Sequence, residues 1–336
     1  MKVNIFLMVT IALFVVLWFS QDYIGEEGET IYIAFAGPMG ESAGKTMTNA
    51  IKLYIDKVNN KKLLSDNKKL QLLEFNDKND CGPNKTAHNE AMRIVKEDQA
   101  LAVIGHWYSG CSVVGGKVYK KHKIPAITPG SVSVEVTQDN EWYFRNIYKG
   151  SASGQFLAHY VKQVFKSDQV TIVYDKSDYG SYLAQMFENA SVELGMNATK
   201  HKIHDDKNKE QEFARIVRLI KQEQKQAGAI LLAVQAKDAV QIVKLIKDKG
   251  IPNKILGGSS FSEQDFKEGF NEFPREMSNP GHYTNDIHVA TPLIFDTANE
   301  KAQQFQDEYK DKYPNTKEID WSAAYAYDTI RVLVKA

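Results

Sequence analysis

The chain alternates short, continuous apolar runs with longer segments in which apolar residues recur at helical spacing. The runs predict strands buried on both faces, and the periodic segments predict helices that cover a sheet. Between Lys45 and Val58, for example, Met47, Ile51 and Tyr54 fall on one helical face. The predicted strands are TIYIAFA (30–36), LQLLEF (70–75), LAVIG (101–105), IPAIT (124–128), YFRNI (143–147), VTIVYD (170–175), AILLAV (229–234) and KILGG (254–258). This alternation predicts β-α-β units and therefore parallel sheets.

A polar crossing near residues 148–153 interrupts this pattern, which then starts again. Two α/β units of similar size predict two doubly wound parallel-sheet lobes joined by a hinge. In open α/β sheets, ligands bind beyond the carboxyl ends of the strands. Two such sheets that face each other form a cleft, and motion at the hinge can close the cleft over a small molecule.

The N-terminal segment, residues 1–22, has the pattern of an export signal or a membrane anchor. Lys2 precedes an uncharged, mostly apolar run from Ile5 to Phe19. This run is shorter than the roughly 20 residues that a spanning helix usually needs. The bulky Trp18 and Phe19 lie where signal peptidase favours small residues, so we predict an uncleaved anchor formed by residues 5–19. A cleaved signal and an ordinary buried helix are the alternatives, and both membrane interpretations place the rest of the chain outside the cytoplasm.

Net charge and cysteine content bear on the binding partner and on the cellular compartment. The 42 basic and 42 acidic residues balance, so charge gives no reason to expect a nucleic-acid partner. Cys81 and Cys111 are the only cysteines, and an oxidising compartment favours their pairing. We therefore predict a disulfide between them, with two buried thiols as the alternative.

The stretch GPMGESAGKT (37–46) resembles a phosphate-binding loop but has the wrong spacing. The motif G-x-x-x-x-G-K-[ST] requires a glycine where Met39 stands, and Pro38 removes a backbone donor. Nucleotide hydrolysis is therefore not favoured. A Gly-rich turn at the mouth of a cleft fits better, with Ser42 as the most plausible ligand contact in it.

Catalytic and metal-binding patterns are sparse. SGCS (109–112) lacks the glycine that a nucleophile elbow needs before its serine. His201 and His204 precede two aspartates and form a candidate metal pair, although such residues also occur on solvated faces or at strand ends. We predict no enzyme activity, no metal site and no cofactor.

Four stretches together resemble one family. They are VIGHWYSGCS (103–112), IPAITPGSVS (124–133), YFRNIYKGSASGQFLAHYV (143–161) and VYDKSDYGSYLA (173–184). Their order and spacing are similar to those of the type I periplasmic binding proteins, in the leucine/isoleucine/valine-binding branch. The resemblance runs from about residue 30 to the end of the sequence. It implies lobe I at 28–148 and 288–336, and lobe II at 149–287.

The end of the sequence also resembles part of this family. WSAAYAYDTIRVLVKA is similar to the helix that returns to the first lobe. Family members continue with further strands, so the resemblance implies that the C-terminal part of lobe I is incomplete here.

The resemblance also implies individual ligand contacts. The hydroxyl of Ser109 would bind a ligand carboxylate, and Tyr179 would close over the ligand from lobe II. Gly130 and Ser131 belong to a turn that contacts the ligand. Trp107 and Tyr108 stand at apolar contacts, with a core position as the alternative for either. Trp321 would line the cleft. Cys111 is shifted by three residues from the family's disulfide position, but both cysteines stay near the same loop.

Two positions depart from the family pattern. Ser259 stands where the amino-acid binders have an acidic residue for the ligand ammonium, and Gln235 replaces an expected tyrosine. An ammonium buried without a carboxylate is costly, so a branched-chain amino acid is not favoured over another small polar molecule.

Together these features predict an extracytoplasmic solute-binding protein. It would capture an amino acid-like molecule or a small carboxylate or amide for an ABC-type importer. The alternative is a membrane-tethered ligand-sensing domain of a receptor or signalling protein.

Overall fold

The computed structural model describes residues 28–97, 100–204, 208–316 and 318–336. The predicted hydrophobic helix within residues 1–22 lies outside these ranges. Within them, no helix has both the length and the apolar character needed to cross a bilayer.

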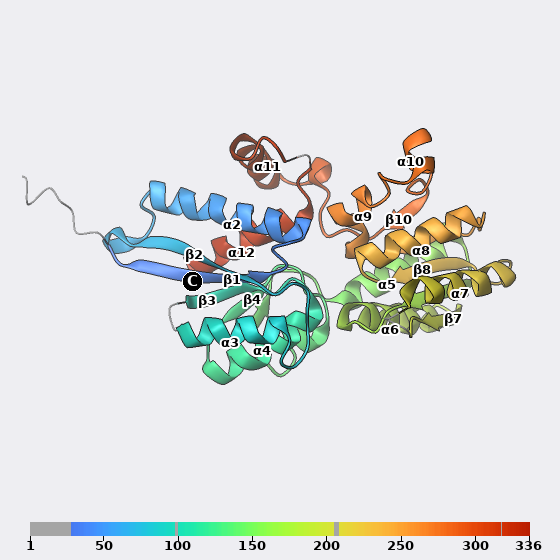
Figure 1. Cartoon of the computed structure of the whole chain (residues 1–336), viewed down its shortest axis with the longest axis horizontal. Coiled ribbons are helices and arrows are strands. Elements are labelled where there is room, and N and C mark those ends of the chain that lie inside the picture. Colours follow the sequence, from blue (N-terminus) through green and yellow to red (C-terminus); the bar gives the residue numbers. More distant parts are fainter. Residues whose placement is uncertain (1–27, 98–99, 205–207, 317) are drawn as a thin grey trace, which may run out of the picture.

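Lobe I is built on a parallel sheet with the strand order β2-β1-β3-β4-β5. Its strands are β1 (Thr30–Gly37), β2 (Lys69–Asn76), β3 (Ala100–Gly105), β4 (Ala126–Thr128) and β5 (Tyr143–Arg145). Helices α2 (Ser42–Asn60) and α12 (Trp321–Lys335) cover one face, and α3 (Thr86–Glu97) and α4 (Ser109–His122) cover the other (Figure 1). Short helical turns lie at Ser65–Asn67 (η1) and Val134–Val136 (η2). Helix α11 (Glu300–Lys312), preceded by η5 (Phe295–Thr297), packs beside α2.

Lobe II repeats this plan with the parallel order β10-β9-β8-β6-β7. Its strands are β6 (Gln169–Tyr174), β7 (Asn197–Lys202), β8 (Ala229–Ala233), β9 (Ile255–Gly257) and β10 (Ile287–Val289). Helices α5 (Gly150–Tyr160), continued by η3 (Val161–Phe165), and α6 (Asp178–Glu193) pack on one face. Helices α7 (Lys209–Gln222) and α8 (Ala236–Asp248) pack on the other. The short elements η4 (Ser259–Ser262), α9 (Gln264–Glu268) and α10 (Pro274–Ser278) follow β9.

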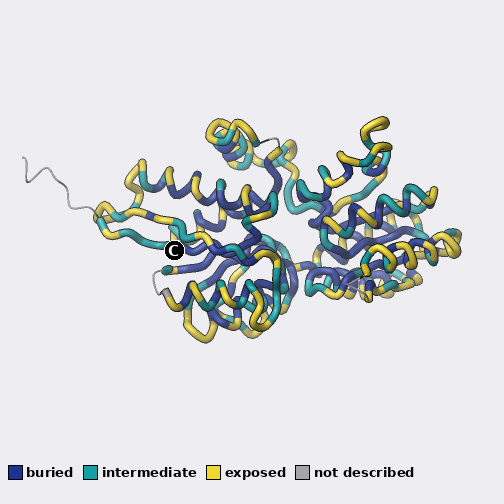
Figure 2. The backbone as a smooth tube through the Cα atoms, in the orientation of Figure 1, coloured by how far each residue is buried: buried dark blue, intermediate teal, exposed yellow. Residues whose placement is uncertain are grey.

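The predicted fold of two parallel-sheet α/β lobes is confirmed, and the cores explain why the strands read as continuous apolar runs. Along β1, Ile33 and Phe35 belong to the core under α2 and α12, whereas Ala34 and Ala36 belong to the core under α3 and α4. Because both faces are covered by helices, neither set of positions can be polar. The buried strands therefore run through the middle of each lobe, and exposed positions lie on the outer helices and loops (Figure 2).

The pattern of apolar runs did not predict two strands of lobe II, β7 and β10. β7, NATKHK, is an edge strand paired only with β6, and most of its residues are exposed or half-buried. An edge strand with one solvated side does not need an apolar run, so periodicity missed it. β10 pairs with β9 over 287–289, so the chain stays in lobe II two residues beyond the boundary expected at 287.

Candidate functional site

A small cavity lies between the lobes, where the carboxyl ends of the two sheets meet. Its volume is about 20 Å³, roughly the room that one water molecule needs. A larger outer chamber of about 610 Å³ shares some of its lining residues. The residues lining the inner cavity are Trp107, Tyr108, Ser109, Gly130, Tyr179, Gln235, Ser259, Ser260, Glu263 and Trp321. Every predicted contact residue except Ser42 and Ser131 therefore lies on this wall.

Lobe I supplies hydrogen-bond donors to the cavity. The chain leaves β3 at Gly105 and enters α4 at Ser109, whose side chain is almost fully buried. The Ser109 Oγ accepts a hydrogen bond from the Ser133 N–H at 3.3 Å, so its own proton is available to another acceptor. The first N–H groups of a helix have no partner within the helix, and they carry the positive end of its dipole. The start of α4 is therefore suited to an anionic group such as a carboxylate.

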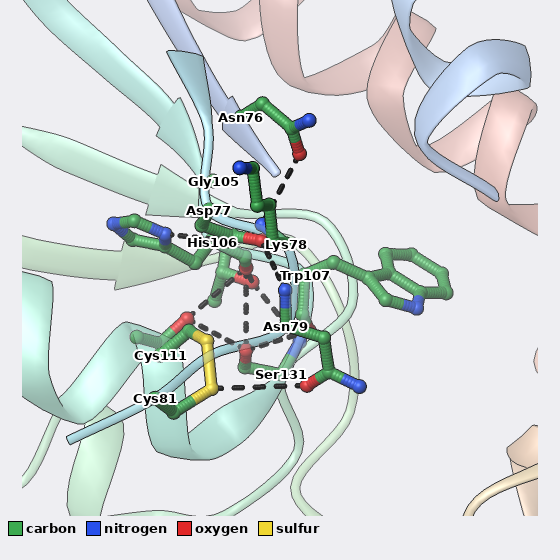
Figure 3. A network of polar contacts seen from close by, with 12 residues as sticks. Asn76, Asp77, Lys78, Asn79, Cys81, Gly105, His106, Trp107, Cys111 and Ser131 are labelled. Atoms are coloured by element: carbon green, nitrogen blue, oxygen red, sulfur yellow. Dashed lines mark hydrogen bonds and ion pairs between the residues drawn. A yellow bond between two sulfur atoms is a disulfide. The ribbon is translucent and has the colours of Figure 1, made fainter. Parts of the chain in front are cut away.

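A buried polar network holds the loop before α4 in place (Figure 3). The His106 ring is fully buried, with Nδ1 2.8 Å from Asp77 Oδ2 and Nε2 3.0 Å from the Tyr119 hydroxyl. The Thr128 hydroxyl donates to the His106 carbonyl at 2.7 Å. In Figure 3 the His106 ring turns toward Asp77, whereas the Trp107 ring points away from the network. This network fixes the loop from behind and leaves the Trp107 side chain for the cavity wall.

Ser131 belongs to this support and is not among the residues that line the inner cavity, so its ligand contact stays a prediction. Its hydroxyl lies 2.9 Å from the Trp107 carbonyl and 2.7 Å from the Ser112 Oγ. The side chain is fully buried behind the loop. Its bonding capacity is used by the protein itself because the loop carbonyls would otherwise be buried without partners.

The predicted Cys81–Cys111 disulfide is present in the structure. It joins the loop after β2 to the first turn of α4, two residues beyond Ser109 (Figure 3). Cys111 is completely buried, while Cys81 lies on the wall of the outer chamber. The bridge therefore ties the start of α4 to a neighbouring loop at the edge of the cleft.

Two tryptophans form the aromatic side of the cavity. The rings of Trp107 and Trp321 lie 4.7 Å apart, centre to centre, and both side chains are almost fully buried. Gly130 lies against Trp107, since a Cβ added there would lie 2.3 Å from the ring atom Cε3. The Trp321 Nε1 is buried and has no hydrogen-bond partner among the residues that the structure describes. It is therefore a donor without an acceptor at the cavity wall.

Lobe II contributes hydroxyl and amide groups. Tyr179, in the first turn of α6, places its hydroxyl 3.2 Å from the Ser260 Oγ. Gln235 directly precedes α8, and its backbone N–H donates to Asp175 Oδ2 at 3.3 Å. The other carboxylate oxygen of Asp175 accepts hydrogen bonds from the backbone and hydroxyl of Ser177. Asp175 thus stabilises the two turns that present Tyr179 and Gln235.

Glu263 is a cavity residue that the sequence did not single out. It lies between η4 and α9, and its side chain reaches the cavity although it follows the strand end by several residues. The 3-10 turn η4 bends the chain back, so spacing counted along an extended chain points to Ser259 and misses Glu263. Ser260 was missed as well, because only the folded loop shows which neighbour of Ser259 faces the cavity.

Burial gives Glu263 unusual electrostatics. Only 7% of the residue is exposed, and its carboxylate has no hydrogen-bond or ion-pair partner within the described ranges. Burial raises the pKa of Glu263 well above its usual range, and the carboxylates of Asp320 and Asp265 raise it further.

Ser42 joins the lobes at the rim of the cleft and is not among the residues that line the inner cavity, so its ligand contact stays a prediction. Its hydroxyl donates to Gln264 Oε1 at 2.6 Å, so a bond runs from α2 of lobe I to α9 of lobe II. Nearby, Glu41 Oε2 accepts a bond from the Tyr108 hydroxyl at 2.5 Å, and Glu41 Oε1 lies 3.6 Å from Lys237 Nζ. The Ser42–Gln264 and Glu41–Lys237 contacts join the two lobes, whereas Glu41 and Tyr108 both belong to lobe I.

Gln264→Ala should lower the affinity for a cavity ligand about two- to tenfold, because the lost hydrogen bond is worth roughly 0.5–1.5 kcal/mol. The ligand should dissociate faster, since the substitution destabilises the closed form and leaves the cavity wall unchanged. A double-mutant cycle with Ser42→Ala, read by calorimetry and stopped-flow release, checks this. In the double variant the second substitution should add little. Fully additive effects would contradict the interlobe bond.

The histidine pair does not form a metal centre within the described ranges. His201 lies on the edge strand β7 and His204 follows it, while the two aspartates that come next lie outside those ranges. Among the described residues, no group of three or more potential ligands could hold a metal ion.

Comparison with known proteins agrees with this architecture. Residues 31–336 match the family model described as periplasmic binding protein. The chain is 33% identical to an amino acid binding protein of Pseudomonas aeruginosa over 129 aligned residues. This alignment covers 38% of this chain and 34% of that protein. The chain is also 28% identical to the Leu/Ile/Val-binding protein of Escherichia coli over 177 aligned residues. This second alignment covers 52% of this chain and 47% of that protein. The matched stretches thus span less than half of these relatives.

A solved structure extends the likeness to the whole fold. The leucine binding protein LivK of Thermotoga maritima superposes with a TM-score of 0.76 at 21% identity, over 91% of this chain and 82% of that one. Both lobes and the order of their elements are therefore shared. The chain belongs to the periplasmic binding protein family, and its two lobes have the type I fold of the leucine/isoleucine/valine-binding branch.

Proposed function

We propose that this protein captures a small polar solute, either amino acid-like or a small carboxylate or amide, between its lobes and delivers it to an ABC-type importer. The observation that carries the proposal is the cavity at the facing carboxyl ends of the two sheets, which residues of both lobes line. Its wall combines hydroxyl groups from both lobes with the start of α4. No step in this proposal requires a bond in the solute to break.

The geometry suggests how capture would proceed. A carboxylate or other acceptor would bind lobe I first, at the Ser109 hydroxyl and the unpaired amides of α4. Closure would then bring Tyr179 and Gln235 of lobe II over the solute. The bond between Ser42 and Gln264 forms only after closure, so it would stabilise the loaded form.

The relatives support the solute class and the location. Both curated relatives are named for amino acid binding, and the family works outside the cytoplasm. The Cys81–Cys111 disulfide is consistent with an oxidising compartment. Partnership with a permease follows from the family likeness and is part of the proposal.

The apolar run at residues 5–19 supports a second candidate, a membrane-tethered sensing domain. Both candidates use the same cleft, and they differ in what the closed form contacts. Cell fractionation of the full chain distinguishes a tethered protein from a released one, and a permease that co-purifies with the ligand-loaded protein would favour import.

A thermal-shift screen against amino acids, small carboxylates, amides and sugars tests the proposal. A solute at 100 times its Kd should stabilise the protein by about 2.7 kcal/mol and raise the melting temperature accordingly. Failure of every compound class to shift the melting temperature would contradict solute capture at this cavity.

Ser109→Ala should weaken the binding of any hit about ten- to a hundredfold, because hydrogen bonds to charged groups contribute roughly 1.5–3 kcal/mol. The melting temperature of the empty protein should change little, since the hydroxyl accepts only one long bond. Ser278→Ala, at an exposed position on α10, is the matched control and should bind normally. Calorimetric titration measures both. Unchanged affinity in Ser109→Ala would remove this residue from the site.

A further inference from the structure

Four carboxylates meet where the two lobes approach each other. Glu41, directly before α2, and Asp320, directly before α12, belong to lobe I, while Glu263 and Asp265 follow β9 in lobe II. Asp320, Asp265 and Glu41 all act on Glu263 as like charges. We call these four residues the interlobe carboxylate cluster. Because two of its members come from each lobe, the cluster is complete only when the lobes are close together.

Glu263 and Asp320 are the buried members of the cluster. Only 7% of Glu263 and 6% of Asp320 is exposed. Within the described ranges, no hydrogen bond or ion pair satisfies the Glu263 carboxylate. Asp320 Oδ1 accepts the Ser322 N–H at 3.0 Å and caps α12, whereas Asp320 Oδ2 is buried without a partner among the described residues. An ionised carboxylate buried in this way is costly, and a proton removes that cost by removing the charge.

Lys237 opposes the like charges around Glu263, but it is engaged elsewhere. Its Nζ lies 3.6 Å from Glu41 Oε1 and 3.9 Å from Asp265 Oδ2, so it bridges the lobes through two other members of the cluster. Its side chain is 70% exposed, so water screens its effect on Glu263. A solvated lysine thus leaves most of the negative charge at the interface uncompensated.

The other titratable neighbours of the buried pair add little positive charge. Lys267 on α9 acts to lower the pKa of Asp320, but Lys267 is exposed and forms an ion pair with Glu318. Three tyrosines also lie near the pair, and burial raises the pKa of each, so their hydroxyls stay neutral. These tyrosines are Tyr108, Tyr179 and Tyr309.

Closure of the lobes therefore changes how tightly the cluster holds protons. Burial raises the pKa of Glu263 well above its usual range, and Asp320 and Asp265 raise it further. Burial also raises the pKa of Asp320. When the lobes separate, both carboxyls return to water, where such groups titrate at about 4. The closed form thus binds protons that the open form releases.

We infer that closure of the empty cleft takes up a proton at the interlobe carboxylate cluster, so acid holds the empty protein closed and a rise in pH opens it. This inference goes beyond the proposed function, because it concerns the protein without a solute and holds whichever solute is captured. The cluster would thereby set the fraction of empty protein that is open to receive a solute at a given pH.

The closing equilibrium should depend on pH in one direction, because the closed form has the raised pKa. Below about 4 both forms are protonated, so these groups make no contribution to the pH dependence. Between about 4 and the raised pKa of the closed form, the closing equilibrium constant should fall as the pH rises. The fall is up to tenfold per pH unit for each proton taken up. Above the raised pKa the fall levels off, since both forms are then ionised.

Energy transfer between two dyes on the empty full chain measures this equilibrium. Gln304 on α11 of lobe I and Gln241 on α8 of lobe II are exposed and uncharged, so cysteines introduced there can carry the dyes. Both native cysteines are held in the disulfide, which directs the dyes to the introduced thiols. The closed fraction should fall as the pH rises from about 4 to about 9.

Conservative substitutions in the labelled protein identify the groups responsible. Glu263→Gln and Asp320→Asn each remove one titrating carboxyl, and the asparagine keeps an oxygen that can cap α12. Each variant should weaken the pH dependence, and the double variant should stay closed throughout. Glu272→Gln, at an exposed position beyond α9, is the matched control and should respond like the wild type. Thermal melts check that every variant is folded, and either single variant suffices if the other is not.

The outcomes are separate from those of the solute screen. A dye separation that is constant across the pH range, or that shortens as the pH rises, overturns the inference. So does a pH dependence that is as strong in the folded variants as in the wild type. These results would leave solute capture standing, because no solute is present in the experiment. Failure of every compound in the solute screen would contradict the proposed function and leave proton-linked closure to be decided by the dye measurement.

Discussion

Gly130→Ala should lower ligand affinity between roughly ten- and a hundredfold, making it one of the most damaging single changes at the cavity wall. An added Cβ would lie 2.3 Å from Trp107 Cε3, well inside normal contact distance. Trp107 cannot retreat easily, because its ring packs on Trp321 and its carbonyl is held by Ser131. Overpacking in such a place typically costs about 1–3 kcal/mol, and the displaced ring would enter the cavity.

Gly40→Ala is the matched control for this substitution. Gly40 lies in the loop after β1, and a Cβ added there would meet no atom within 4 Å. Its backbone does not adopt a conformation that requires glycine. Calorimetry and thermal melts on both variants check the prediction. Normal binding by Gly130→Ala would show that Trp107 does not define the ligand space.

Removing the disulfide should have the largest effect on stability. Replacement of Cys81 and Cys111 by alanine should lower the free energy of unfolding by about 3–4 kcal/mol, the loop-entropy value for the 30 residues between them. The bridge anchors the first turn of α4, so affinity should fall together with stability. Urea unfolding monitored by fluorescence measures the first effect, and ligand titration well below the unfolding midpoint measures the second.

Reductant provides the internal control for the disulfide. Wild-type protein treated with a thiol reductant should unfold at the same urea concentration as the alanine double variant, and the variant itself should not respond to reductant. An unchanged midpoint in the double variant would contradict a structural role for the bridge.

Much of the cavity could be predicted because its residues directly follow apolar strands. Ser109 and Gly130 follow β3 and β4, while Tyr179 and Gln235 follow β6 and β8. In parallel α/β sheets these positions meet at one edge, so motif order along the chain was enough to bring them together. Whether these residues contact a ligand remains a prediction for the experiments above.

The two predicted residues that do not line the inner cavity show the importance of side-chain direction. Ser42 and Ser131 lie in the expected loops, but Ser42 bonds to Gln264 across the cleft and Ser131 bonds to the Trp107 carbonyl. A hydroxyl can serve a ligand or its own backbone equally well, and sequence pattern does not distinguish these roles. Glu263 was not assigned to the cavity, because it comes four residues after Ser259, and the short turn η4 brings it back to the cavity wall.

The sequence by itself determined the two-lobe α/β architecture, the cysteine pair and the loops that form the cleft. It did so because buried parallel strands require continuous apolar runs, and these runs fix where each loop begins. The tertiary structure decided which side chains on those loops face the cavity and which carboxylate remains without a partner. Such choices depend on contacts between residues far apart in the chain, as in the approach of α9 to α2 and of Trp321 to Trp107. The pattern of apolar and polar residues along the chain does not contain these long-range contacts. The charged groups on the cavity wall could therefore be identified only from the folded structure of both lobes.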